Sequence, residues 1–94
     1  MKLFGQIMLL FLVSFMIAST ISFAREKEIP LSEVPQTVID AAKKEIKGIR
    51  LIEAEIITKT SGETLYEIEG KVGGKKYELH ITPGGEVIGT ILED

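Results

Sequence analysis

Glutamates two residues apart are the side chains of this chain most able to do chemistry. Two such pairs, Glu53 with Glu55 and Glu67 with Glu69, follow residue 50, and His80, the single histidine, follows Glu78 at the same spacing. A spacing of two places side chains on one face of a β-strand, so we expect these groups to gather on one face of a sheet. With two apolar neighbours they form the candidate partner-contact face: Glu53, Glu55, Ile57, Glu67, Glu69, Glu78, His80 and Ile88.

Metal binding and catalysis are the sharper interpretations of this face. Several carboxylates could supply oxygen ligands to a hard cation such as calcium, but alternate strand positions lie about 6–7 Å apart and no Asp-rich loop surrounds a shared point. One histidine without cysteine disfavours zinc. No sequence elbow marks Ser32, Ser61 or a threonine as a nucleophile beside His80. We therefore expect no catalytic residue, no cofactor and no metal site.

The glutamates belong to stretches in which apolar and polar residues alternate. After Gly48 four such stretches follow, separated by turns at 61–63, 73–74 and 83–85. This punctuation is typical of short antiparallel strands joined as a meander. We expect the strands to cover 50–59, 66–72, 77–82 and 86–93. Their other face should form the core, with these residues: Ile52, Ala54, Ile56, Tyr66, Ile68, Tyr77, Leu79, Ile81, Val87 and Ile91.

One amphipathic helix should cover that core face. From Val34 to Ile49 apolar residues recur at steps of three, four and seven, which places them on one helical face. Pro35 suits the first turn and Gly48 suits the position just past the helix end. The sequence thus predicts a helix over about 35–47 and an α+β fold, one helix packed on a four-stranded antiparallel meander sheet.

The first 24 residues have the layout of a secretory signal peptide. Lys2 precedes an apolar run that ends at Ala18, and a small-x-small site ends at Ala24. Cleavage before Arg25 predicts a periplasmic or secreted protein. The alternative is an uncleaved anchor, because the 21 residues 3–23 are long enough to cross a bilayer.

Charge and cysteine content narrow the class of partner. Without Lys2 the chain has one basic residue fewer than its total of 11, against 14 acidic ones, so its net charge is about −4. Nucleic-acid binding draws on clustered Lys and Arg, and is therefore not expected. The absence of cysteine excludes disulfides and an amino-terminal lipid anchor. We divide the chain into a signal peptide at 1–24, a flexible lead-in at 25–30 and a small domain at 31–94.

Four groups of residues within 31–92 occur in the order of a known family. They are Val34-Pro35 with Val38 and Ala41, Leu65-Tyr66-Glu67-Ile68-Glu69, Gly74-Lys75-Lys76-Tyr77-Glu78-Leu79, and Gly85-Glu86-Val87-Ile88. In this order the chain resembles the PepSY domain, especially short exported PepSY-like proteins similar to the repeats of beta-lactamase inhibitory protein. The turn Thr82-Pro83-Gly84-Gly85 departs from the family, in which an acidic residue often precedes the glycine.

The resemblance implies a helix on an antiparallel sheet and a noncatalytic role. PepSY domains occur in propeptides of secreted metallopeptidases and are proposed to restrain peptidase activity. We therefore expect an exported module that binds an envelope or secreted protein, with a peptidase as one such partner. An extended peptide could add to an open sheet edge, and the expected edges are 50–59 and 86–94.

Three alternatives to this role stay open. Charged residues can simply solvate an open sheet face. A structural or stress-related domain could instead close a homodimer through Ile57, Ile88 and Leu92. The Glu-rich face could also bind a metal ion or a small ligand weakly.

Overall fold

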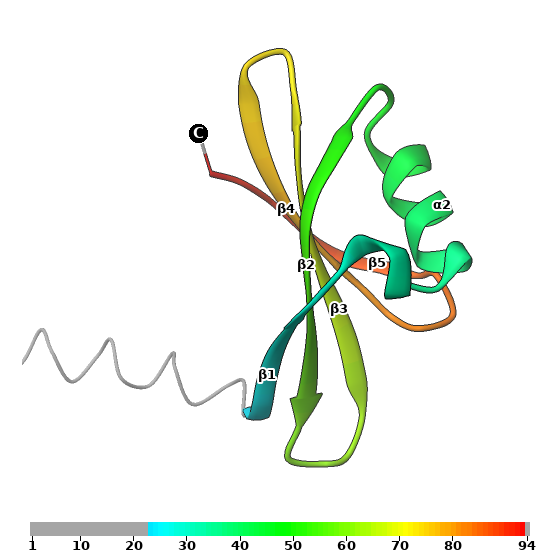
Figure 1. Cartoon of the computed structure of the whole chain (residues 1–94), viewed down its shortest axis with the longest axis vertical. Coiled ribbons are helices and arrows are strands. Elements are labelled where there is room, and N and C mark those ends of the chain that lie inside the picture. The colour runs from blue at the N-terminus through cyan, green and yellow to red at the C-terminus, as the bar shows by residue number, and fades with distance from the viewer. Residues whose placement is uncertain (1–22, 94) are drawn as a thin grey trace, which may run out of the picture.

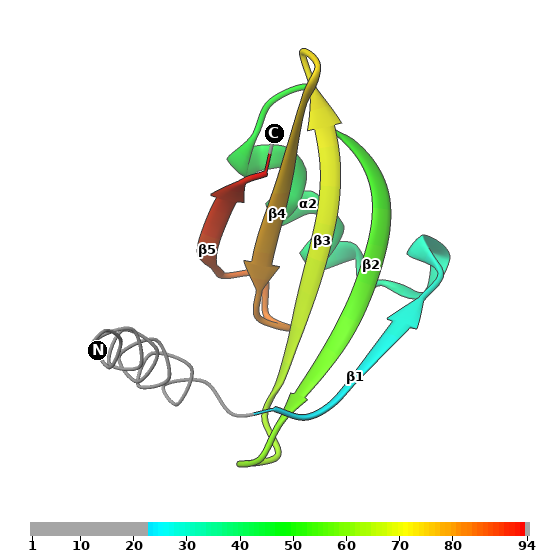
Figure 2. The same cartoon turned by 90° about the vertical axis from the view of Figure 1, so that its left-hand side faces the viewer.

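The computed structural model describes residues 23–93, which form an antiparallel sheet with helical segments on one side (Figures 1 and 2). The α+β class with one α-helix on an antiparallel sheet is confirmed. The elements are β1 (Phe23–Ile29), the 3-10 helix η1 (Leu31–Glu33), α2 (Gln36–Glu45), β2 (Arg50–Lys59), β3 (Thr64–Val72), β4 (Lys75–Ile81) and β5 (Val87–Leu92). Residues 1–22 of the predicted signal peptide lie outside the described residues. Within 23–93, no helix has the length and hydropathy to cross a membrane.

The sheet has five strands rather than the four expected, in the order β1-β2-β3-β4-β5. The meander of β2 to β5 is as expected, but the segment predicted as a flexible lead-in, 25–30, contributes most of β1, which pairs antiparallel with β2. Backbone pairing needs no apolar side chains, and Ile29 packs against the core, so a charged segment can form this strand. The expectation that 50–59 is an edge is wrong, and the open edges are β1 and β5.

Helix α2 covers one sheet face. It runs over Gln36–Glu45, shorter than the predicted 35–47, because Ile46 already has extended dihedral angles (φ −129°, ψ 101°). Val38 and Ala42 on its inner side are fully buried and pack on a row of paired residues from the central strands: Ala54, Ile68 and Leu79. This contact builds the core.

The two tyrosines lie on the core face of the sheet, as predicted. Tyr66 and Tyr77 are partly buried and pack against the core cluster. Tyr66 lies between Ile56 and Ile81 in the register, so it shares the helix-covered face with them. Their packing there is confirmed.

Two bulges overturn core predictions in β2 and β5. The register shifts between Leu51 and Glu53, which leaves Ile52 exposed. A second register shift lies in β5. Val87 pairs with Ile81 and Gly89 pairs with His80, so Ile88 is the extra residue. Beyond it, Ile91 pairs with Glu78 on the open face and is exposed. An extra residue in one strand exchanges the faces of the residues that follow.

We expect Gly70→Ala to destabilise the fold. A Cβ at this buried position would lie 2.6 Å from Cγ1 of Ile49 and 3.0 Å from the carbonyl oxygen of Arg50. Relief of this overlap requires backbone or core shifts that cost about 1–3 kcal/mol. Urea unfolding measures the loss.

Gly89→Ala is the matched control, because its nearest new contact is the Cβ of His80 at 3.9 Å. Its unfolding free energy should stay within about 0.5 kcal/mol of the wild-type value. Equal losses for both variants would contradict the packing described at Gly70.

Candidate functional site

The strand register places carboxylates on the sheet face opposite α2. Figure 2 shows the sheet from this side, with the helix behind the strands. One cross-strand row contains Glu28, Glu55, Glu67 and His80. The neighbouring row holds Glu53, Glu69 and Glu78. All six titratable residues of the predicted contact face therefore lie together. We define the acidic face as Glu26, Glu28, Glu53, Glu55, Glu67, Glu69, Glu78, His80 and Glu93.

The two apolar residues of the predicted contact face have different outcomes. Ile57 pairs with Leu65 on β3 and with Glu26 on β1 and is 1% exposed, so a partner cannot reach it. The unexpected strand β1 is the reason, since it lies alongside β2. Ile88 stands at the β5 bulge and is exposed. Of this pair, Ile88 alone can contact a partner.

Twist brings carboxylates of different rows into contact. Carboxylate oxygens of Glu26, Glu55 and Glu67 lie within 4.8 Å of one another. Ligand atoms of Glu67, Glu78 and His80 form a second such group. Glu67 belongs to both groups, so interacting side chains run from β1 to β4.

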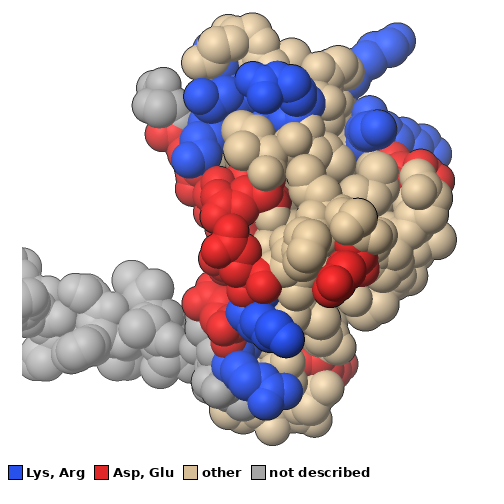
Figure 3. All heavy atoms as spheres, viewed as in Figure 1, with Lys and Arg blue, Asp and Glu red and all other residues tan. Residues whose placement is uncertain are grey.

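His80 and Lys76 supply the nitrogen partners of the carboxylates on this face. Nε2 of His80 donates a hydrogen bond to Glu78 at 2.8 Å and lies 3.9 Å from an oxygen of Glu67. Nζ of Lys76 lies 3.5 Å from Glu69 and 4.0 Å from Glu93. In Figure 3 the red acidic stripe ends at blue residues near the β3–β4 turn. The face is thus acidic over β1 to β4 and basic at this end.

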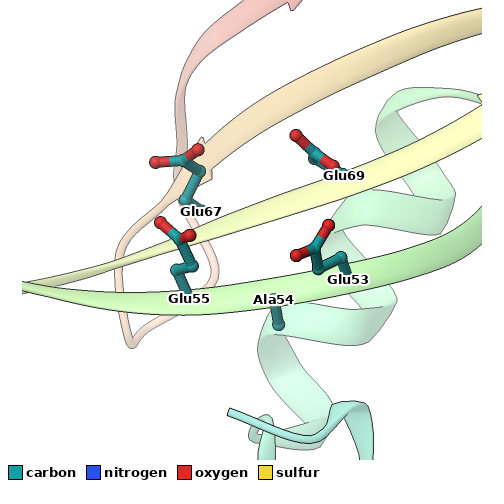
Figure 4. A pocket seen from close by; sticks show the side chains of 5 residues that line it. All are labelled: Glu53, Ala54, Glu55, Glu67 and Glu69. Carbon is teal, nitrogen blue, oxygen red and sulfur yellow. The ribbon is translucent and has the colours of Figure 1, made fainter. Parts of the chain in front are cut away.

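A shallow hollow of about 20 Å³ lies between β2 and β3 (Figure 4). It is lined by Glu53, Glu55, Glu67, Glu69 and Ala54, and the four glutamate side chains leave the sheet on the same side, with the carboxylate of Glu55 directed toward Glu67. The volume suffices for one water molecule. These oxygens could contribute to a cation site, for which calcium takes six to eight oxygen ligands from carboxylates, carbonyls and water.

The close approach of these carboxylates changes their pKa values. Burial, with the charge of Glu78 and a hydrogen bond to it, raises the pKa of Glu67 to about 8. Burial and a hydrogen bond to Glu26 also raise the pKa of Glu55. For Glu78 burial acts upward, but hydrogen bonds to His80, Glu93 and Glu67 prevail and lower its pKa.

Glu93 also belongs to this group of interacting carboxylates, through a hydrogen bond to Glu78. Its hydrogen bond to Glu78 raises its pKa, and desolvation adds to the rise. A carboxyl group that keeps its proton, as Glu67 with its pKa of about 8 does at neutral pH, can donate to a neighbouring carboxylate. The acidic face can therefore take up protons, or accept the Lys or Arg of a partner.

Sequence reasoning missed Glu26, Glu28 and Glu93 as members of this face. The first two fell in the supposed lead-in, although their spacing of two repeats that of the later pairs. Glu93 follows the bulged strand, and its side was not evident from alternation. The spacing of Glu26 and Glu28 ahead of Ile29 was the signal that could have revealed β1.

Comparison with protein families, curated proteins and solved structures finds no match to this chain. The resemblance to PepSY domains stays a prediction. The acidic face and the two sheet edges are therefore interpreted from their own geometry.

We expect Glu67→Gln to stabilise the protein at alkaline pH. Because the folded-state pKa is about 8, above the ordinary 4.5, the folded chain holds this proton more tightly than the unfolded chain. Its contribution to stability is present below pH 4.5 and is lost as the pH rises through 8. Glutamine stays neutral, so at pH 8.5 the variant should gain about 1 kcal/mol after solvent screening.

Urea unfolding at pH 4 and pH 8.5 checks this expectation. At pH 4 the variant and the wild type should agree. Glu45→Gln, on an exposed position of α2, is the control and should show no comparable pH-dependent gain. A Glu67→Gln protein less stable than the wild type at pH 8.5 would contradict the shared-proton description.

Proposed function

We propose that this protein is an exported, noncatalytic binding module whose β5 edge accepts an extended segment of a partner polypeptide. The main observation behind the proposal is that β5 lacks the features that keep edge strands from pairing with another chain. The strand holds no charged residue and no proline, and three of its own large apolar side chains are about half exposed: Ile88 at 51%, Ile91 at 47% and Leu92 at 50%. Edges of this kind readily pair with another chain.

The opposite edge is protected. In β1 four charged residues follow one another from Arg25 to Glu28, and all four are exposed. Charges on an edge strand discourage pairing with a further strand. The contrast between the edges therefore favours binding at β5.

Backbone groups available at β5 can be assigned from the register. The N–H of Glu93 donates to the carbonyl of Lys76 on β4 at 2.7 Å, so the backbone of Glu93 faces inward. Direction alternates along an antiparallel strand, and Gly89 and Ile91 share that inward direction. The N–H and C=O groups of Thr90 and Leu92 accordingly point outward, toward an incoming strand.

The surroundings of the edge suggest the chemistry of the partner. Leu92 lies on the helix side, where it pairs with Tyr77, while Ile91 lies beside Glu78 on the acidic face. A strand added at β5 would gain from apolar side chains on the first side. Lys or Arg at alternate positions would reach toward Glu78 and Glu93 on the other.

The remaining parts of the proposal have separate support. Export is supported by the leader-like sequence of residues 1–24. A noncatalytic role is supported by the resemblance to PepSY domains and by the lack of a sequence elbow that would mark a nucleophile beside His80. A peptidase as partner is supported by the resemblance to PepSY domains.

Site-specific photo-crosslinking tests the binding role. A benzophenone amino acid at position 92 should crosslink in living cells to a second polypeptide, identified by mass spectrometry. The same probe at Lys44, exposed on α2, is the control and should not.

Thr90→Pro, combined with the probe, removes an outward N–H and should abolish the crosslink. Thr90→Val keeps that N–H and should preserve it. Absence of any crosslink from position 92, or a crosslink indifferent to proline, would overturn binding at this edge.

Cleavage of the leader is checked by intact-mass measurement of the exported protein. We expect a mature chain that begins at Arg25, because Ala24 completes a small-x-small site. Such a chain retains Arg25–Ile29 for pairing with β2. A full-length protein in the membrane fraction would support the anchor instead.

A further inference from the structure

We infer that, in the free protein, β5 pairs with β5 of a second copy about a two-fold axis at Ile91. The inference rests on the proposed binding role of this edge and names one occupant for it. The regular part of the edge lies between the bulge and the strand end. Gly89 to Leu92 keep one register with β4, and the hydrogen bond of Glu93 continues it. Ile91 is the midpoint of this stretch.

The outward backbone groups are self-complementary about that midpoint. In an antiparallel pair centred on Ile91, Thr90 of one copy faces Leu92 of the other. Since the N–H and C=O groups of both residues point outward, two copies can form four backbone hydrogen bonds. No group that already bonds to β4 is needed.

The side chains also agree with this register. Ile91 would meet Ile91 of the second copy, and Thr90 would meet Leu92. Glu93 would face Gly89, which has no side chain, and its charge lies beside Lys76 of its own copy at 4.0 Å. Like charges directly opposite each other destabilise a strand pair, and this arrangement has none.

Farther from the axis, the two outer rows have complementary charges, while the row of Glu53, Glu69 and Glu78 meets its own copy across the two Ile91 side chains. The row of Glu55, Glu67 and His80 leads to Gly89 at the edge. The row that contains Glu93 leads away from the edge to Lys76, Lys71 and Arg50. The two-fold axis joins these rows, so the acidic row of each copy continues into the basic row of the other.

The pairing closes on itself. It places both acidic faces on one side of a continuous sheet and both α2 helices on the other. The edges left open are the two charged β1 strands, which resist further pairing, so assembly stops at a dimer as an isologous contact requires. Six-residue strands bury little area, and we expect a weak dimer that competes with a foreign strand for β5.

Sedimentation equilibrium on the mature protein, Arg25 to Asp94, tests the pairing over about 10 µM to about 1 mM, the range suited to a small interface. The wild type and Thr90→Val should shift from monomer to dimer across this range. Thr90→Pro, with circular dichroism to verify its fold, should remain monomeric. Ile91→Lys, which sets like charges opposite each other at the axis, should also remain monomeric.

Disulfide trapping supplies the geometric readout, because the chain has no cysteine of its own. Residues 91 of the two copies would form a non-hydrogen-bonded pair, whose close spacing suits a disulfide. Ile91→Cys should therefore oxidise to a covalent dimer at least about tenfold faster than Thr60→Cys in the exposed β2–β3 turn.

Each outcome decides between the two proposals. A wild type that stays monomeric overturns self-pairing, as does a dimer that survives Thr90→Pro or shows no preference for the cysteine at 91. If photo-crosslinking from position 92 still captures a different polypeptide in a Thr90-dependent way, the binding role of β5 stands and only its second-copy occupant is wrong. Loss of both results removes the two proposals together.

Discussion

The packing of α2 on one face of the sheet is the constraint on which the rest of this structure depends. Val38 and Ala42 are fully buried against Ala54, Ile68 and Leu79. Because side chains alternate along a strand, a slip of one residue in any central strand would turn glutamates into this core. Burial of charge costs far more than the core of so small a domain can offset. Because the glutamates cannot enter the core, they must lie on the opposite face of the sheet.

The same alternation governs the edge. One extra residue at Ile88 moves Ile91 to the acidic side and Leu92 to the helix side. It also fixes which backbone groups bond to β4 and which point outward. A bulge is therefore what gives β5 its accessible Thr90 and Leu92 groups and leaves its apolar side chains about half exposed. Proton sharing on the face and the proposed strand pairing at the edge depend on one register.

Alternation and punctuation suffice to predict most of this fold from sequence. They predict the helix, the meander of β2 to β5 and the gathering of Glu53, Glu55, Glu67, Glu69, Glu78 and His80 on one face. Bulges were not predictable in this way, since an extra residue leaves the apolar pattern intact, and Ile52 and Ile91 were assigned to the core face for that reason. The strand β1 was missed because its pairing is made by backbone groups, while its side chains are mostly charged.

The candidate site was predictable in membership but not in its interactions. Contacts such as Glu26 with Glu55 cross between rows, because the sheet twists. The raised pKa of Glu67 depends on burial and on neighbours from other strands. Neither quantity can be derived from spacing along the chain.

Amide hydrogen exchange along β5, measured at a concentration where the protein is monomeric, tests the assigned register most directly. We predict slow exchange for Gly89, Ile91 and Glu93, whose N–H groups face β4, and fast exchange for Thr90 and Leu92, whose N–H groups face outward. Protection of Thr90 and Leu92 equal to that of Ile91 would contradict it, as would fast exchange at Glu93.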